Sequence, residues 1–169
     1  MWLLPKYPEQ GYEELGMKFF TKEWLSGDRD DEDPYIAFTE YEAHLSKIRN
    51  SFTFDLKALT SYRLHDGLVK VVNHRVSENK LSVTLIIGDL QVGYQRLELT
   101  YSNAECAPSD LQFLVLASRT ENFEILEDEW DLSDSRKFTH RLIFSTRQEI
   151  EIAFDDINYQ ASPLEDRKL

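Results

Sequence analysis

The sequence predicts an α+β fold, in which an N-terminal helix packs on an antiparallel, strongly bent sheet or sandwich of about six or seven strands. Apolar residues recur at helical spacing over residues 34–49, whereas several segments after residue 64 alternate between apolar and polar side chains. The connections between those segments have hairpin length, which favours an antiparallel meander over βαβ units. Because sheets twist, we do not expect so many strands to stay flat.

The length of 169 residues suits one domain. We expect this single α+β domain to span residues 17–169, because prolines and glycines interrupt every periodic pattern in residues 1–16. Residues 1–16 are therefore predicted to be an N-terminal arm. Either translation starts at Met17, or the arm is an extension with little structure.

Residues 34–49 form the predicted helix. Asp33 is placed to cap its N-terminus, and Pro34 suits the first helical position. Lys47 and Arg49 lie near its end, where cations favour the helix dipole. The apolar face consists of Ile36, Phe38, Tyr41, Leu45 and Ile48.

The segment 54–62 forms either a short helix or an irregular turn, and predicted strands follow it. The first two strands are joined by a turn at Glu78-Asn79, and Gly88-Asp89 marks the turn into the third. The expected strands are 68–76, 80–88, 94–101, 111–117, 123–130, 138–145 and 149–154. The inward-facing positions are Leu81, Val83, Leu85, Ile87, Leu97, Leu99, Tyr101, Ile150, Ile152 and Phe154.

The chain carries 31 acidic and 19 basic side chains, for a net charge of −12. This charge disfavours a nucleic-acid partner, because phosphate binding depends on clustered Lys and Arg. No apolar run approaches the roughly 18 residues of a membrane helix, so no membrane partner is expected. Cys106 is the only cysteine, which fits a reducing compartment, and we expect a cytoplasmic protein.

Several charged and nucleophilic residues are candidates for catalytic or metal sites. In the acidic loop 28–33, Asp33 and Thr39 stand where a calcium loop requires Gly and Glu, so we expect a solvated loop with at most adventitious divalent binding. No histidine pair has zinc-ligand spacing, Cys106 lacks a nucleophile signature, and hydrolase and nucleotide-binding glycine motifs are absent. We expect no metal, no cofactor and no catalytic residue of these kinds.

His65-Asp66 is the most pointed polar pair, at the entry to the first long strand. A histidine beside an acid serves as a base with its orienting partner, or as part of a ligand site. Adjacent residues on a strand point to opposite faces, however, which argues against a dyad. The structural alternative is a turn at Asp66-Gly67, with His65 bonded to nearby backbone or to a carboxylate.

The segment 124–134 contains six acids around a tryptophan. It is interpreted as an exposed edge strand whose charges prevent aggregation. A second interpretation is a docking surface, in which Trp130 is an anchor within a negative field that attracts a basic partner. The third is a catalytic carboxylate pair. The candidate binding residues of this segment are Glu127, Asp128, Glu129, Trp130 and Asp131.

Three segments resemble an uncharacterised family of small bacterial proteins: Met17-Lys-Phe-Phe-Thr-Lys-Glu-Trp24, the core that opens with Leu64-His-Asp-Gly-Leu-Val69, and the closing strands through Glu149-Ile-Glu-Ile-Ala-Phe154. The Leu-His-Asp strand entry is also similar to that of immunity proteins from bacterial toxin loci. The resemblance covers residues 17–156. It implies a protein of unknown function, with toxin neutralisation as one role, and supplies no catalytic residues.

The leading hypothesis is a non-catalytic, cytosolic bacterial protein that binds a basic protein partner, such as a toxin, through an acidic surface. The alternative is a small-ligand binder or hydrolytic enzyme with a site around His65 and Asp66, joined by a residue such as His140. A third possibility is a symmetric homodimer formed through an exposed apolar sheet face.

Overall fold

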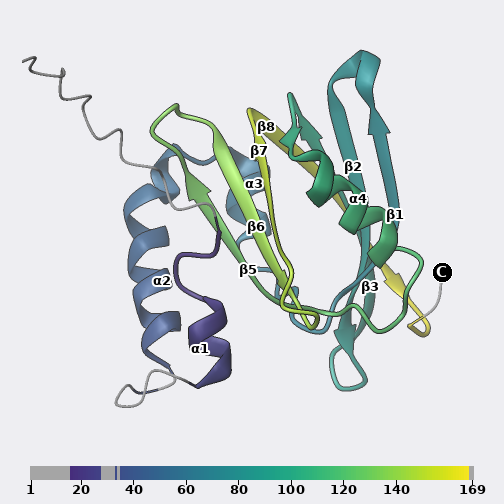
Figure 1. Ribbon diagram of the computed structural model, residues 1–169, viewed down its shortest axis with the longest axis horizontal. Helices are drawn as coiled ribbons and strands as arrows, with labels where there is room; N and C mark the ends of the chain where they lie inside the picture. Colours follow the sequence, from purple (N-terminus) through teal and green to yellow (C-terminus); the bar gives the residue numbers. More distant parts are fainter. Residues whose placement is uncertain (1–15, 28–32, 34, 168–169) are drawn as a thin grey trace, which may run out of the picture.

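Two antiparallel four-stranded sheets form the framework of the chain (Figure 1), in a computed structural model that describes residues 16–27, 33 and 35–167. The first sheet has the strand order β1-β2-β3-β8 and the second has the order β4-β7-β6-β5. The strands of the first sheet are β1 (Leu68–Arg75), β2 (Lys80–Asp89), β3 (Gly93–Ser102) and β8 (Asp156–Leu164). Those of the second are β4 (Glu105–Cys106), β5 (Ile125–Leu132), β6 (Phe138–Phe144) and β7 (Glu149–Phe154).

Four α-helices accompany the sheets within the described residues: α1 (Lys22–Ser26), α2 (Ile36–Ile48), α3 (Phe54–Leu59) and α4 (Pro108–Ala117). Short 3-10 turns lie at Arg49–Ser51 and Val76–Glu78. The predicted α+β class, with a helix before the sheet, is confirmed. The sequence left open whether the strands form one bent sheet or a sandwich, and the structure has two sheets.

The inner faces of the two sheets pack against each other. All ten inward positions predicted from the alternation in three strands are buried. Tyr101 of β3 contacts the opposite sheet directly, because its ring meets Phe154 edge-on with a centroid distance of 5.2 Å. The core is therefore formed where period-2 alternation in the sequence is clearest.

Helices α1 and α2 cover the outer face of the second sheet, so that this sheet is the middle layer of three (Figure 1). The predicted helix is confirmed, with Tyr41 and Leu45 buried on its inner side. Asp33 accepts a hydrogen bond from the Tyr35 N–H through Oδ1 at 2.9 Å, close to the predicted capping role. Phe20, in the segment before α1, packs edge-on against Tyr41 at 5.4 Å.

The predicted strand at 111–117 is wrong, because these residues belong to α4. The run Leu-Gln-Phe-Leu-Val-Leu-Ala is apolar at both helical and strand spacings, so periodicity alone does not separate the two. Pro108 at the first helical turn is the local signal for a helix. Leu114 and Ala117 are buried, and α4 packs against β1 and β7.

The described residues form eight strands, where about six or seven were predicted. The two additional ones are β4, with only two residues, and β8, at the edge of the first sheet. Strand β8 was not predicted because it lacks an alternating apolar pattern, and Ile157 is its only buried residue. Its register with β3 is nevertheless regular from Asp156 to Leu164.

No helix in the described part of the chain is long and apolar enough to cross a membrane. Residues 28–32, which hold most of the acidic loop, and residues 1–15 of the arm lie outside the described residues. The predictions made for them stay predictions.

Candidate functional site

The acidic strand β5 binds the segment that precedes α1. Glu129 accepts three backbone N–H groups through its carboxylate, from Lys18 at 2.9 Å, Phe19 at 2.7 Å and Phe20 at 2.8 Å. Glu129 is only 1% exposed. Burial raises the pKa of Glu129, although the three N–H donors act in the opposite direction. Glu129 therefore fixes residues 18–20 across the second sheet.

Asp131 is the centre of a second buried cluster on the same face. Its Oδ2 lies 2.7 Å from Lys18 Nζ and 3.0 Å from Arg141 Nη1, and its Oδ1 lies 2.7 Å from His44 Nε2. Burial alone would raise the pKa of Asp131, but the donors lower it well below its usual range. Asp131 thus joins the N-terminal segment, α2 and β6.

Trp130 and Asp128 point the other way, into the space between the sheets. The indole of Trp130 stacks on the imidazole of His140 with a centroid distance of 3.5 Å and an angle of 8°. His140 lies 2.8 Å from the Tyr101 hydroxyl through Nδ1 and 3.1 Å from Asp128 Oδ2 through Nε2. Burial lowers the pKa of His140, so this group is a satisfied core network.

The acidic segment is consequently not the exposed edge that the sequence indicated. Glu129, Trp130 and Asp131 are all buried, and α2 closes the edge of β5, where the Tyr41 hydroxyl accepts the Trp130 N–H at 2.6 Å. Trp130 is only 3% exposed, so its side chain is not open to a partner in this structure. The sequence showed a cluster of acidic residues, but the groups that bind these residues belong to distant parts of the same chain.

The turn at residues 64–67 brings His65 and Asp66 to the start of β5. The Asp66 N–H donates to the Ile125 carbonyl at 2.8 Å, and the Gly67 N–H donates to the Leu64 carbonyl at 2.8 Å. Asp66 has a φ of 60°, a conformation that Asp tolerates better than most residues. The expected turn at Asp66-Gly67 is present.

His65 and Asp66 do approach each other, contrary to the strand-based argument. The distance between His65 Nε2 and Asp66 Oδ1 is 3.4 Å, because the pair lies in a turn and not on a strand. His65 Nδ1 lies 2.5 Å from the Leu126 carbonyl and 3.6 Å from Glu127 Oε1. Two candidate groups that are distant in sequence therefore meet in one place.

Among the groups around His65, Glu127 has a carboxylate whose pKa is shifted. Burial raises the pKa of Glu127 to about 7, with His65 acting to lower it and Asp128 to raise it. His65 and Asp66 line a cleft of about 390 Å³ that extends to Ile87 and Val92. His140 is not part of this group, because it contacts Asp128, whose side chain lies on the opposite face of β5 from Glu127.

The β2–β3 hairpin carries apolar side chains beside this cleft. Leu90 is 90% exposed and Val92 is 78% exposed. The turn that presents them is held by Asp89 Oδ1, which accepts the Gln91 N–H at 2.7 Å and the Val92 N–H at 2.9 Å. These hydrogen bonds lower the pKa of Asp89. We use the name hairpin-tip surface for Asp66, Asp89, Leu90, Val92 and Glu124.

A second cleft borders the hairpin on its other side, with a volume of about 450 Å³. It is lined by Asp66, Asp89, Leu90 and Glu124. Arg167 also lines it and forms an ion pair with Glu124 at 2.8 Å. The hairpin-tip surface thus combines two exposed apolar side chains with three carboxylates, of which Glu124 contacts Arg167 and Asp66 contacts His65. The sequence signal for it was an apolar pair inside a hairpin turn, Leu-Gln-Val after Gly88-Asp89.

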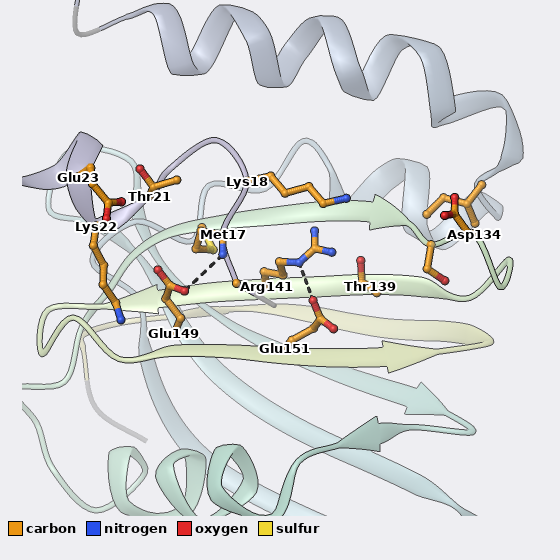
Figure 2. Close-up of a pocket in the computed structure, with 13 residues that line it drawn as sticks. Met17, Lys18, Thr21, Lys22, Glu23, Asp134, Thr139, Arg141, Glu149 and Glu151 are labelled. Carbon is orange, nitrogen blue, oxygen red and sulfur yellow. Dashed lines mark hydrogen bonds and ion pairs between the residues drawn. The ribbon is translucent and has the colours of Figure 1, made fainter. Parts of the chain in front are cut away.

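A cleft with a volume of about 750 Å³ lies between residues 16–23 and the second sheet (Figure 2). Arg141 and Thr139 project from the same face of β6 beneath the segment that carries Lys18 (Figure 2). Glu151 accepts a hydrogen bond from Arg141 Nε at 2.6 Å.

Within the described residues, no three side chains of the types that bind metals are grouped around a common point. Cys106 is half-buried, and burial raises the pKa of its thiol to about 12, which suits an inert thiol. The outer face of the first sheet carries Ser82 and Thr100, joined at 3.2 Å, and an Arg96–Glu98 ion pair. This part of the face is polar, and the homodimer stays a prediction.

Comparisons of the chain with protein-family models, with curated proteins and with solved structures found no match. The resemblance to small bacterial and immunity proteins therefore stays a prediction. Only the geometry of the described residues bears on function.

Proposed function

We propose that the chain is a non-catalytic protein-binding module, immunity-like in its mode of action, that engages a basic protein partner through the hairpin-tip surface. The observation that carries this proposal is the outward presentation of Leu90 and Val92 on a hydrogen-bonded turn. Large apolar side chains on an ordered tip gain free energy when a partner covers them, at about 25 cal/mol per Å² of apolar surface buried. A turn held in advance also reduces the entropy lost on binding.

Charge supports a basic partner. The chain has a net charge of −12, and Asp66, Asp89 and Glu124 surround the apolar tip. Complementary charge accelerates association and selects against acidic partners, whereas buried apolar anchors supply most of the affinity. We include a cytoplasmic location in the proposal, since a chain with a single thiol fits a reducing compartment. Fractionation of the native cells tests that location.

The test is a selection of twelve-residue peptides, displayed on phage, for binding to the immobilised full-length protein. The expected peptides carry a net positive charge. Their affinity falls at least tenfold for Leu90→Ser/Val92→Ser and less than twofold for Phe54→Ser, the matched control. Phe54 is 84% exposed at the start of α3 and lines none of the clefts beside the hairpin tip or the N-terminal segment. Peptides without positive charge, or equal losses in both variants, would overturn the proposal.

A second candidate function is favoured by the meeting of His65, Asp66 and Glu127 beside a cleft. An imidazole between two carboxylates, one with a pKa of about 7, has the chemistry of an acid–base pair for a small ligand or a hydrolytic reaction. Its test is hydrolysis of p-nitrophenyl acetate and p-nitrophenyl phosphate by the wild type and by His65→Asn. Turnover that His65→Asn abolishes supports an enzyme, and equal background rates in both proteins exclude one for these substrates.

A further inference from the structure

Two adjoining clefts run along the outer side of β7 and share Gly16, Glu149 and Glu151. One is the cleft of Figure 2, and the other, with a volume of about 810 Å³, reaches β4 and the start of α4. We call the continuous depression the β7 groove. It lies outside the hairpin-tip surface, and none of its lining residues belongs to that surface.

Carboxylates outnumber cations in the β7 groove by six to three. The six are Glu23, Glu105, Asp110, Asp134, Glu149 and Glu151. The cations Lys18 and Arg141 are already neutralised, since both contact Asp131 beneath the groove and Arg141 also contacts Glu151. Lys22 is the third cation and lies on the exposed side of α1. Two of the carboxylates are paired as well, Glu151 with Arg141 and Glu105 with Lys137 at 2.7 Å, and the balance that remains at the surface is negative.

A separate observation points to a ligand. Thr139 is 3% exposed, and its Oγ1 has no hydrogen-bond partner within the described part of the chain. The hydroxyl lies on the floor of the groove, beside Arg141 and on the same face of β6 (Figure 2). A buried hydroxyl without a partner costs about 1–3 kcal/mol, so its retention calls for a group that completes it.

We propose that the β7 groove binds a lysine- or arginine-bearing segment of the partner protein. Asp134 and Glu149 meet the cationic side chains, and Thr139 accepts or donates a hydrogen bond at the bottom of the groove. Glu149 is available for this because its carboxylate accepts only a long hydrogen bond within the described residues, at 3.4 Å from the Met17 N–H to Oε2. Asp134 is exposed at the β5–β6 turn. The proposal rests on the proposed function, to which it adds the place where the basic partner's charge is recognised.

The probe is fluorescein-labelled octalysine, titrated against the full-length protein by fluorescence anisotropy at 50 mM salt. We expect Asp134→Asn/Glu149→Gln to weaken binding at least fivefold. The control Glu40→Gln/Glu42→Gln removes the same two charges from exposed positions on α2, and we expect a loss below twofold. Thr139→Val is expected to weaken binding about threefold while its melting temperature stays equal or rises, a combination that a purely structural role does not produce.

Equal losses in the two double variants would overturn the groove as the site and leave a basic partner in place. Failure of octalysine to bind the wild type would also overturn it. The peptide selection on the hairpin-tip surface decides the proposed function separately, because its variants, Leu90→Ser and Val92→Ser, do not line the groove.

Discussion

Glu129 Oε1 accepts the backbone N–H of Phe20 at 2.8 Å, across a separation of 109 residues in the chain. Together with the N–H groups of Lys18 and Phe19, this contact makes an acidic strand the anchor of the N-terminal segment. The strand that the sequence marked as a working surface therefore holds the fold together. Four predictions follow from this arrangement and from the residues around the hairpin tip.

Replacing Glu129 with Gln should loosen residues 18–20. The amide keeps one acceptor oxygen but presents an NH₂ group to at least one backbone N–H that the carboxylate now satisfies. Because the site is buried, we expect a loss of about 1–3 kcal/mol in the free energy of unfolding in urea. Hydrogen exchange should quicken at the amides of Lys18, Phe19 and Phe20 before it quickens in β3. Unchanged exchange at these three amides would contradict the anchor role.

Replacing Asp131 with Asn should be more harmful, because Lys18 and Arg141 would lose the carboxylate between them. Removing one member of a buried ion pair costs about 3–5 kcal/mol. Since the pKa of Asp131 is lowered in the fold, its contribution is present above the unfolded pKa of 3.8 and is lost as the pH falls below it. The wild type should thus lose stability between pH 4 and acid unfolding more steeply than Asp131→Asn, measured by urea unfolding at each pH. Parallel curves for the two proteins would refute this role.

Glu127 should show the opposite pH dependence. Its pKa is raised from 4.5 to about 7, so the fold favours the protonated carboxyl. This contribution is complete below pH 4.5 and is lost as the pH rises through 7. Glu127→Gln should remove about 1–2 kcal/mol of pH-dependent destabilisation between pH 5 and 8, a figure reduced from the full shift because the side chain is partly exposed. Carbon-13 NMR of the carboxyl should give a midpoint near 7, and a midpoint near 4.5 would be inconsistent with it.

Replacing Gly88 with Ala should disrupt the hairpin tip. Gly88 has a φ of 97°, and a Cβ at this position would lie 2.1 Å from the Gly93 carbonyl oxygen. The backbone must shift to accept the methyl group, so we expect a loss of stability above about 2 kcal/mol. Gly93→Ala is a useful comparison, because its φ of 86° is also strained but no atom lies within 4 Å of the added Cβ. Thermal unfolding should therefore show a larger loss for Gly88→Ala, and equal losses would argue against the steric explanation.

The sequence predicted elements best where one pattern dominated. Alternation identified β2, β3 and β7 and assigned their buried faces correctly, because a half-exposed strand requires a period of two. The apolar run in α4 satisfied two periods at once, and β8 satisfied none, so both were missed. Charge was the least reliable guide, since the position of Glu129 on β5 does not reveal that Phe20 lies above it.

The candidate residues divide in the same way. His65-Asp66 was recognisable as a pair from the chain, and the turn after Leu64 explains why the two side chains meet. Leu90 and Val92 could not be recognised from the sequence, because an apolar pair in a turn resembles the end of a strand until its exposure is known.

The sequence by itself determined the α+β class, the predicted helix, most strands and the net charge of −12, because these depend on local periodicity and composition. Only the tertiary structure decided which charges are free. Glu129 accepts hydrogen bonds from residues 18–20, and Asp131 contacts His44 and Arg141. Asp134 and Glu149, in contrast, line an open groove. The partners of a carboxylate are the groups that lie close to it in space. The separation of those groups along the sequence does not reveal that they are close.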